Sequence, residues 1–207
     1  LLYGGKLVLV PRMTARDPKE YVRLLQKQQV TILNQTPTVF YQLIDEERKL
    51  PERHMNVRFV VFGGEALKPG KLLPWFERYP LTSLINMYGI TETTVHVTFK
   101  EIGSRELMRN ISNIGRPIAS LSAGIIDKYM QDVPWNVPGE LVVSGQGVAR
   151  GYLNRPELTG ERFPRNAGTD RTRLYRSGDL ARLLDNGEME YMGRIDHQVK
   201  IRGNRVE

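Results

Sequence analysis

Short apolar runs alternate with helix-start signals over the first hundred residues, and this alternation limits the fold more than any other feature of the chain. Asp17-Pro18 and Pro37 each begin a helix, because Asp can cap a helix and Pro fits its first position. The first helix is expected to run to about Gln28, and a third is expected over residues 71–78. Strands are expected over residues 6–10, 30–33, 58–62 and 83–86. Such alternation is typical of a mostly parallel α/β layer.

A different texture begins near Ile111, where short β-like runs are separated by Pro, Gly and Asn turns. These runs cover residues 124–127, 140–144, 180–184 and 189–192. Asn186-Gly187 lies between two alternating runs and indicates a β-hairpin. We therefore predict an α/β subdomain over residues 1–110 and a small, distorted β-barrel or sheet over residues 111–193. A third unit is expected only to begin, at residues 194–207.

The net charge of +7 raises the question of a nucleic-acid partner. The basic excess is spread along the chain, however, without a basic block or an aromatic-interleaved stripe, so we expect no nucleic-acid surface. No apolar run approaches the ~20 residues of a membrane helix, and no secretory leader is recognisable at the start. The chain contains no cysteine, which excludes disulfides and thiolate metal sites. We therefore expect a cytoplasmic protein without a membrane partner.

The stretch INMYGITETTVH, residues 85–96, has the composition of a nucleotide site. Tyr88 offers a face for a base, and Gly89 allows a tight turn. Thr91 offers a hydroxyl for phosphate, and Glu92 a carboxylate for Mg²⁺. A strand followed by a capped turn would have a similar sequence, so this stretch alone leaves both interpretations open. The glycine-rich run at residues 145–151 lacks the GxxxxGK[ST] pattern of a phosphate loop. We interpret it as a structural turn, with contacts to a carrier protein as the alternative.

Three downstream segments accompany this stretch: GELVVSGQGVARGYL at 139–153, YRSGDLAR at 175–182 and GRIDHQVKIRGNRVE at 193–207. In this order and spacing, the four segments resemble the core motifs of adenylation domains of nonribosomal peptide synthetases. These domains belong to the larger adenylate-forming family, with acyl-CoA synthetases and luciferases. The resemblance implies a flavodoxin-like parallel α/β subdomain, then a small distorted β-barrel, then the start of a C-terminal domain. It also implies ATP and Mg²⁺ as cofactors.

The resemblance assigns nucleotide contacts to three parts of the chain. The turn Gly64, Glu65, Ala66 would border adenine, and Tyr88, followed by Gly89, would stack on it. Thr91 and Glu92 would be catalytic, with Thr91 on the α-phosphate and Glu92 holding Mg²⁺. Ile90 stands where the family often has Pro, which changes the stiffness of the loop and no functional side chain.

Further nucleotide contacts are implied near the end of the β-rich region. Asp179 would accept both ribose hydroxyls, with Tyr175 near the nucleotide; the alternative for Asp179 is an Asx-turn or a helix cap. Arg194 would contact the ribose-phosphate side, and Asp196 would be the hinge of the C-terminal domain; otherwise the two form a surface salt bridge. Lys200, Arg202 and Gly203 would lie in the loop exposed to the active site after rotation. Ser177 departs mildly from the Thr common in the family.

Six positions map onto the amino-acid pocket of these domains: Asn34, Val61, Gly63, Met87, Val95 and His96. Glycine leaves room, and three apolar side chains offer walls. Asn34 and His96 can hydrogen-bond a hydroxyl, unless they are buried structural polar groups. A small side chain with one methyl and one hydroxyl fits this set, so threonine is the expected substrate. Serine is its natural competitor, because it differs by one methyl group worth ~1–3 kcal/mol.

The predicted function is ATP-dependent formation of threonyl-AMP with release of pyrophosphate, then aminoacyl transfer to the phosphopantetheine thiol of a peptidyl carrier protein. A condensation domain and a small accessory activator protein are further partners implied by the resemblance. The Asp that binds the substrate amino group, the phosphate loop and the C-terminal catalytic Lys are expected to lie outside this chain, which alone should be nearly inactive. The alternatives are an acyl-CoA synthetase or luciferase-like enzyme, or a non-catalytic nucleotide- or partner-binding subdomain.

Overall fold

The structure is a computed structural model that describes residues 4–51, 55–164, 173–196, 199–201 and 204–206. Its first half contains α1 (Arg12–Arg16), α2 (Pro18–Lys27), β1 (Ile32–Gln35), α3 (Pro37–Glu47), β2 (Phe59–Phe62), η1 (Pro69–Leu72), α4 (Leu73–Arg78), β3 (Ser83–Asn86), η2 (Thr91–Thr93), β4 (Thr98–Ile102) and α5 (Ser104–Arg109). The second half contains β5 (Asn113–Pro117), β6 (Leu121–Ile126), β7 (Gly139–Gly145), α6 (Pro156–Arg162), β8 (Leu174–Leu183), β9 (Met189–Arg194), β10 (Val199–Ile201) and β11 (Asn204–Val206). No helix in these ranges is long and apolar enough to cross a membrane.

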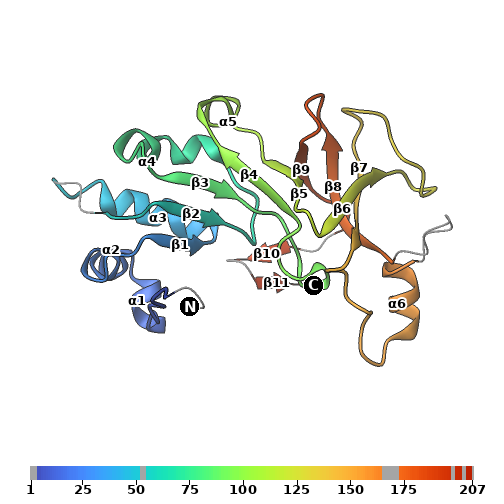
Figure 1. Cartoon of the computed structure of the whole chain (residues 1–207), viewed down its shortest axis with the longest axis horizontal. Coiled ribbons are helices and arrows are strands. Elements are labelled where there is room, and N and C mark those ends of the chain that lie inside the picture. The colour runs from blue at the N-terminus through green and yellow to red at the C-terminus, as the bar shows by residue number, and fades with distance from the viewer. Residues whose placement is uncertain (1–3, 52–54, 165–172, 197–198, 202–203, 207) are drawn as a thin grey trace.

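The α/β half follows the alternation of its sequence (Figure 1). The side chain of Asp17 caps α2 by accepting hydrogen bonds from the backbone N–H groups of Lys19 and Glu20, at 3.0 and 3.2 Å. Strands β1, β2 and β3 pair in parallel, and β4 adds to β3 in antiparallel orientation. The predicted helices from Pro18 and Pro37 and the predicted strand over 83–86 are confirmed. The expected strand over 30–33 lies two residues later, at β1.

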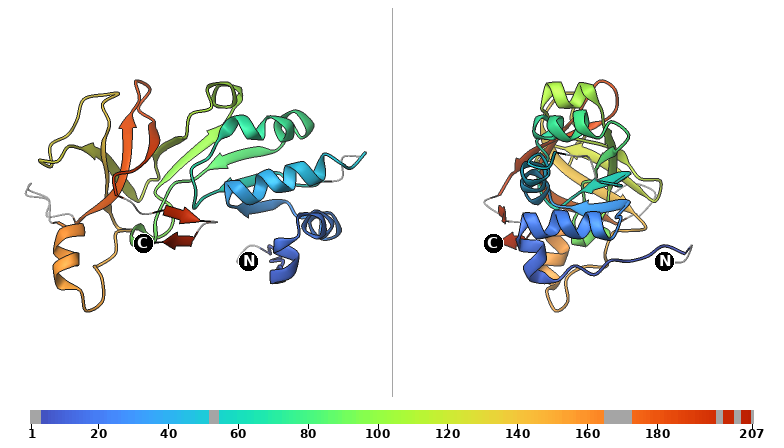
Figure 2. Two further views of the ribbon diagram at one scale, coloured as in Figure 1. Left: turned by 180° about the vertical axis from the view of Figure 1, so that it is seen from behind. Right: turned by 90° about the vertical axis from the view of Figure 1, so that its left-hand side faces the viewer.

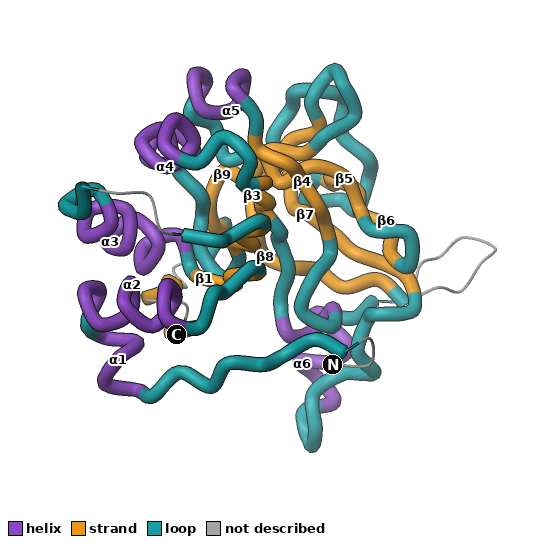
Figure 3. The backbone as a smooth tube through the Cα atoms, turned by 60° about the vertical axis from the view of Figure 1, so that its left-hand side comes forward, coloured by secondary structure: helices purple, strands orange, loops and turns teal. Residues whose placement is uncertain are grey.

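The expected strand over residues 6–10 is wrong. These residues form an extended loop that leads into α1 (Figure 3). Leu7 and Leu9 are 66% and 81% exposed, so this apolar run packs on no core. The run has strand-like composition, but a strand forms only where a neighbouring strand accepts its backbone hydrogen bonds.

The core of the α/β half lies between its helices and the sheet. Phe40 of α3 meets the ring of Phe62 at 5.1 Å and that of Trp75 at 4.9 Å, both edge to face, as aromatic side chains prefer. Helix α2 adds its apolar stripe, from which Tyr21 and Leu25 are buried. This packing fixes the three parallel strands whose carboxyl ends carry the candidate site.

The β-rich half continues the same sheet. Within the described residues, nine strands pair in the order β1-β2-β3-β4-β5-β9-β8-β7-β6. The turn at Asn186-Gly187 joins β8 to β9, which confirms the predicted hairpin. A second core, with Val97, Leu141 and Met189 fully or almost fully buried, packs inside this half. The fold is therefore mixed α/β with a β-rich second half, as predicted, although β4 and β5 were missed.

Two features lie beside the sheet. Helix α6 and the loop before it project away from the β-rich half (Figure 2). After β9, the short strands β10 and β11 pair with each other in antiparallel orientation. Arg202 and Gly203 lie outside the described residues, and only the backbone of Lys200, in β10, is described. The division of the chain at 110 and 193 stays a prediction.

Candidate active site at the carboxyl ends of the parallel strands

A cavity of about 330 Å³ opens where β1, β2 and β3 end. In open α/β sheets, ligands bind at this edge, because the loops that follow parallel strands meet there. The cavity is lined by Asn34, Gly63, Gly64, Met87, Gly89, Ile90, Thr91, Glu92, Val95 and His96. It therefore brings together five of the six residues predicted for an amino-acid pocket, along with both residues predicted to be catalytic.

Val61 is the predicted pocket residue that does not line this cavity. It pairs with Asn34 of β1 and Ile85 of β3 in the centre of the parallel strands. Residues two apart in a strand face the same side, so Val61 lies behind Gly63. Val61 would contact a substrate only if the cavity extended deeper, below Gly63.

A smaller cavity of about 30 Å³ adjoins the first. It is lined by Gly64, Glu65, Ala66, Asn86, Met87, Tyr88, Gly89, Ser112, Ile114 and Tyr191. The two cavities share Gly64, Met87 and Gly89 as a common wall. The smaller one has about the volume of one water molecule, so a purine ring would enter only if its walls separate.

Two tyrosines lie side by side in the wall of the smaller cavity. The ring of Tyr88 lies 6.1 Å from that of Tyr191, tilted by 34°. Burial raises the pKa of Tyr191 to about 12, and the charge of Asp179 adds to this effect. Tyr191 was not predicted as a site residue. The alternating pattern of β9 was the available signal, because it places Tyr191 on the same face of the strand as the buried Met189. Glu65, in the same wall, accepts a hydrogen bond from the backbone N–H of Thr38 at 3.1 Å.

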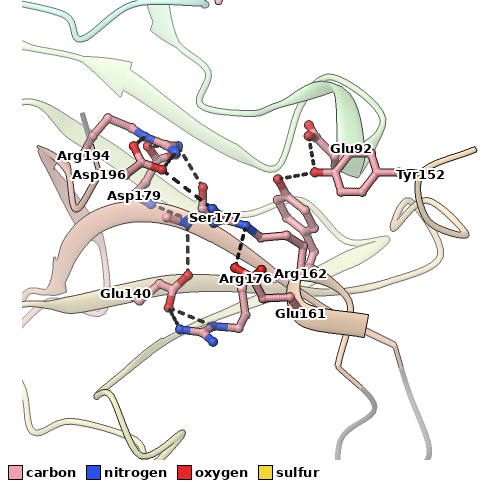
Figure 4. A network of polar contacts seen from close by, with 12 residues as sticks. Glu92, Glu140, Tyr152, Glu161, Arg162, Arg176, Ser177, Asp179, Arg194 and Asp196 are labelled. Carbon is pink, nitrogen blue, oxygen red and sulfur yellow. Dashed lines mark hydrogen bonds and ion pairs between the residues drawn. The ribbon is translucent and has the colours of Figure 1, made fainter. Parts of the chain in front are cut away.

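Asp179 is 1% exposed, and both of its carboxylate oxygens accept hydrogen bonds. Figure 4 shows it beside Arg194 and Asp196. The hydroxyl of Tyr88 donates to Oδ2 at 2.5 Å, and Nη1 of Arg194 donates to Oδ1 at 3.0 Å. Burial and the charge of Asp179 raise the pKa of Tyr88 well above its ordinary value, so Tyr88 stays a donor. A ribose hydroxyl could therefore bind Asp179 only by displacing Tyr88 or Arg194. Of these two partners, Tyr88 is the uncharged one.

Arg194 joins two carboxylates in this network. Its Nε and Nη2 donate to Asp196 at 2.9 and 2.6 Å, while Nη1 reaches Asp179. Burial would lower the pKa of Arg194, but the hydrogen bonds to Asp196 and Asp179 and their charges raise it. Gly178 has a φ of +70°, and a Cβ there would lie 2.9 Å from Arg194 Nη2. The predicted ribose residue and the predicted hinge residue therefore share one arginine.

Thr91 and Glu92 lie in η2 at the rim of the larger cavity. Glu92 is 7% exposed, and its Oε1 accepts a hydrogen bond from the hydroxyl of Tyr152 at 2.7 Å. Tyr175 is 2% exposed, with its hydroxyl 3.4 Å from that of Tyr152, so it lies beside Glu92 rather than on the wall of the smaller cavity. Sequence reasoning missed Tyr152, which follows directly after the glycine-rich run.

The loop from Gly89 to His96 is tightly folded. A Cβ on Gly89 would lie 1.8 Å from the carbonyl oxygen of Val95. Thr94 and Val95 have φ angles of +58° and +71°, a conformation that costs a β-branched residue free energy and is often found at functional sites. Val95 is 61% exposed, at the cavity rim. The buried Nδ1 of His96 has no hydrogen-bond partner among the described residues.

The donor set at the rim fits one kind of metal. Among the described residues, no group of three or more His, Cys, Asp or Glu side chains could hold an ion by itself. Mg²⁺ commonly binds through one or two carboxylates together with the phosphates of a substrate. A buried Glu92 next to the Thr91 hydroxyl fits this mode, because phosphate oxygens would complete the coordination.

Comparisons of this chain with known proteins give matches to one enzyme family. A sequence profile of the family described as "AMP-binding enzyme" matches residues 1–153. One of the plipastatin synthase proteins of Bacillus subtilis (strain 168) is 58% identical over 207 residues, which cover 100% of this chain and 8% of that protein. The dimodular nonribosomal peptide synthase of the same organism is 51% identical over 213 residues, covering 100% of this chain and 9% of the relative. The chain thus spans less than a tenth of the length of these two relatives.

Solved structures show the same fold. PA1221, described as an NRPS protein containing adenylation and PCP domains, matches with a TM-score of 0.83 and 29% identity, over 96% of this chain and 39% of that one. IdnL1 matches with a TM-score of 0.83 and 30% identity, over 96% of this chain and 41% of that one. Because the family profile covers residues 1–153, well over half of the chain, including every residue that lines the larger cavity, the chain belongs to the AMP-binding enzyme family.

Proposed function

We propose that the chain is the part of an amino-acid-activating adenylation domain that binds the amino acid and ATP. The larger cavity would take the amino-acid side chain, and the smaller one would take the adenine. The observation that supports this assignment best is the wall that the two cavities share. An acid in one cavity and a nucleotide in the other would place the carboxylate next to the α-phosphate at the rim formed by Thr91 and Glu92.

The proposed reaction joins the carboxylate of the amino acid to the α-phosphorus of ATP. A carboxylate oxygen attacks phosphorus, the bond to the bridging oxygen of pyrophosphate breaks, and aminoacyl-AMP and pyrophosphate form. Mg²⁺, when bound, would neutralise charge on the phosphates. The residues of this chain would supply positioning and charge compensation, as phosphoryl-transfer sites generally do. Glu92 would hold the ion, and Thr91 would hydrogen-bond the α-phosphate.

Threonine is the amino acid that we propose. Asn34 and His96 both line the larger cavity, as do Met87 and Val95. The imidazole of His96 lines this cavity and could pair with a substrate hydroxyl. A site that hydrogen-bonds a hydroxyl rejects an analogue lacking it, such as valine, by about 10⁴-fold or more. Serine would compete, because it lacks only the methyl group.

After activation, we propose transfer of the aminoacyl group to the phosphopantetheine thiol of a peptidyl carrier protein. The thiol attacks the carbonyl carbon, and AMP leaves. The combination of adenylation and PCP domains in PA1221 supports this step. A condensation domain and a small accessory activator protein complete the proposed partners, on the sequence resemblance alone. Tests of this step need the longer protein, because the chain spans a small share of its relatives.

The decisive experiment is ATP–pyrophosphate exchange by the adenylation domain that contains this chain, with threonine, serine, valine and a fatty acid in parallel. We expect strong exchange with threonine, weaker exchange with serine and little with valine. Exchange with valine would contradict the roles of Asn34 and His96 but keep the chemistry. Exchange with the fatty acid alone would favour an acyl-CoA synthetase-like enzyme. No exchange with any acid, despite ATP binding, would favour a non-catalytic nucleotide-binding module.

A further inference from the structure

Residues 147–152, which comprise the end of the glycine-rich run and Tyr152, form three hydrogen bonds with the turn that carries Glu92. We call them the glycine-rich segment. The backbone N–H of Ala149 donates to the carbonyl oxygen of Glu92 at 2.8 Å. The hydroxyl of Thr94 donates to the carbonyl oxygen of Gly147 at 2.7 Å. The third contact is the hydrogen bond from Tyr152 to Glu92 Oε1. The segment therefore holds both the backbone and the side chain of Glu92, from a point some 60 residues further along the chain.

Packing fixes the position of the Tyr152 hydroxyl. The ring of Tyr152 meets that of Phe163 edge to face at 5.3 Å, and Phe163 in turn lies 4.8 Å from the ring of Tyr175. Phe163 and Tyr175 are 6% and 2% exposed, so this side of Tyr152 faces a closed apolar surface. The backbone N–H of Tyr152 donates to Thr159 Oγ1 at 2.9 Å, which ties it to α6. Both ends of the residue are anchored.

The hydrogen bond from Tyr152 would affect metal binding if the Glu92 carboxylate is a metal ligand. The groups that hydrogen-bond a metal-ligating side chain set its orientation, and removing them typically lowers metal affinity or activity about 10–100-fold. Tyr152 uses one oxygen of Glu92 and contacts neither cavity described above, since it lines neither. It can therefore act on a ligand in either of these two cavities only through Glu92. A purely structural hydroxyl would stabilise the turn and leave metal binding unchanged.

We propose that Tyr152 is a positioning residue that holds the Glu92 carboxylate in the orientation required by a divalent cation bound with the nucleotide phosphates. This inference rests on the proposed function, in which Glu92 is the protein ligand of that cation. It gives the glycine-rich segment a role different from the plain structural turn expected from sequence. The segment delivers the hydroxyl that orients a metal ligand.

The test compares ATP binding with and without Mg²⁺ by titration calorimetry, in the adenylation domain that contains this chain. The variants are Tyr152→Phe, which keeps the ring, Glu92→Gln, and Tyr129→Phe as control. Tyr129 is 70% exposed and lines neither cavity. We expect Tyr152→Phe to reduce the gain in ATP affinity from Mg²⁺ by about 10-fold or more, with metal-free ATP affinity and the melting temperature close to those of the wild type. The Mg²⁺ concentration for half-maximal exchange should rise in parallel.

The outcomes separate the two proposals. If Glu92→Gln removes the effect of Mg²⁺ and Tyr152→Phe does not change it, the positioning role is wrong and the role of Glu92 stands. If Glu92→Gln also leaves the effect of Mg²⁺ intact, the metal role of Glu92 is itself wrong. If Tyr152→Phe weakens metal-free and metal-bound ATP equally, or lowers the melting temperature without changing the ratio of the two affinities, its hydroxyl is structural only.

Discussion

Single residues at the site are constrained by backbone geometry more than by side-chain chemistry. Gly89 is required because another backbone segment occupies the space of its Cβ. Val95 keeps a positive φ because the turn from Thr91 to Thr94 must close within a few residues. Candidate roles for Tyr88, Thr91 and Glu92 could be proposed from the sequence, because each side chain offers a particular chemical group. The hydrogen bond from Tyr88 to Asp179 could not, because it joins residues 91 positions apart.

Replacing Gly89 by alanine should strain this loop. The added Cβ would lie 1.8 Å from Val95 O and 2.8 Å from His96 Cα, so the backbone must move. Overpacking of this kind costs about 1–3 kcal/mol, and we expect this loss in the free energy of unfolding measured with urea. Gly160→Ala is the matched control, since no atom outside the local helix backbone lies within 4 Å of its Cβ position in α6. Equal stability of the two variants would contradict the tight loop.

Partly buried ion pairs join β4 both to the helix that follows it and to a distant turn of the chain. Lys100 of β4 contacts Glu106 of α5 at 3.0 Å and Glu188, next to β9, at 2.8 Å. Asn113 of β5 donates to the same Glu188 at 2.6 Å. Strand β4 was missed from sequence because its polar residues, including this lysine, hide the pattern of a half-buried strand. The helices that begin at Pro18 and Pro37 were predicted because caps and prolines are local signals, whereas α1, α5 and α6 were missed.

Replacing Lys100 by methionine should destabilise this junction. Two carboxylates with side chains 11% and 17% exposed would lose their cation. Because this junction is only partly buried, we expect a loss above the ~1 kcal/mol of an exposed pair and below the ~3 kcal/mol of a fully buried one. Lys49→Met is the control, because Lys49 is 66% exposed and pairs with Glu46 on a helix surface, where such pairs contribute about 0.5 kcal/mol. Urea unfolding of the two variants gives the comparison, and similar losses would argue against the junction.

The same junction predicts an acid-dependent loss of stability. Burial would raise the pKa values of Glu106 and Glu188, but hydrogen bonds, including those from Lys100, lower them below the ordinary value of 4.5. The folded state therefore releases these protons more readily than the unfolded state. This contribution is full above pH 4.5 and is lost as the pH falls through the lower folded values. The slope of unfolding free energy against pH below 4.5 should be shallower in Lys100→Met; an unchanged slope would contradict this account.

At the scale of the whole molecule, one sheet connects two cores. The order of the nine described strands, and the step from β5 to β9, depend on contacts between distant segments, which no local pattern specifies. The mixed α/β fold class could nevertheless be predicted, since the first hundred residues and the later ones have different periodicities; the bounds at 110 and 193 stay a prediction. The candidate site lies where the two parts meet: Tyr88 follows β3, and Tyr191 belongs to β9.

Ionisation of Tyr191, at the meeting point of the two parts, should lower the free energy of unfolding at alkaline pH. Because the pKa of Tyr191 is raised to about 12, the folded state keeps a proton that the unfolded state releases near pH 10. The free energy of unfolding should therefore fall as the pH rises from 10 to 12. Tyr191→Phe should show a shallower fall in urea unfolding over this range, whereas Tyr129→Phe, at an exposed position, should follow the wild type. A wild-type slope in Tyr191→Phe would refute the prediction.

The wall shared by the two cavities also sets which substitutions are independent. Asn34, Val95 and His96 line the larger cavity alone, whereas Met87 lines both. Under the proposed assignment, mutational drift at the first three positions can recode the preferred amino acid while the nucleotide affinity stays constant. A change at Met87 alters both at once. Amino-acid preference could therefore evolve at Asn34, Val95 and His96 without a change in ATP binding.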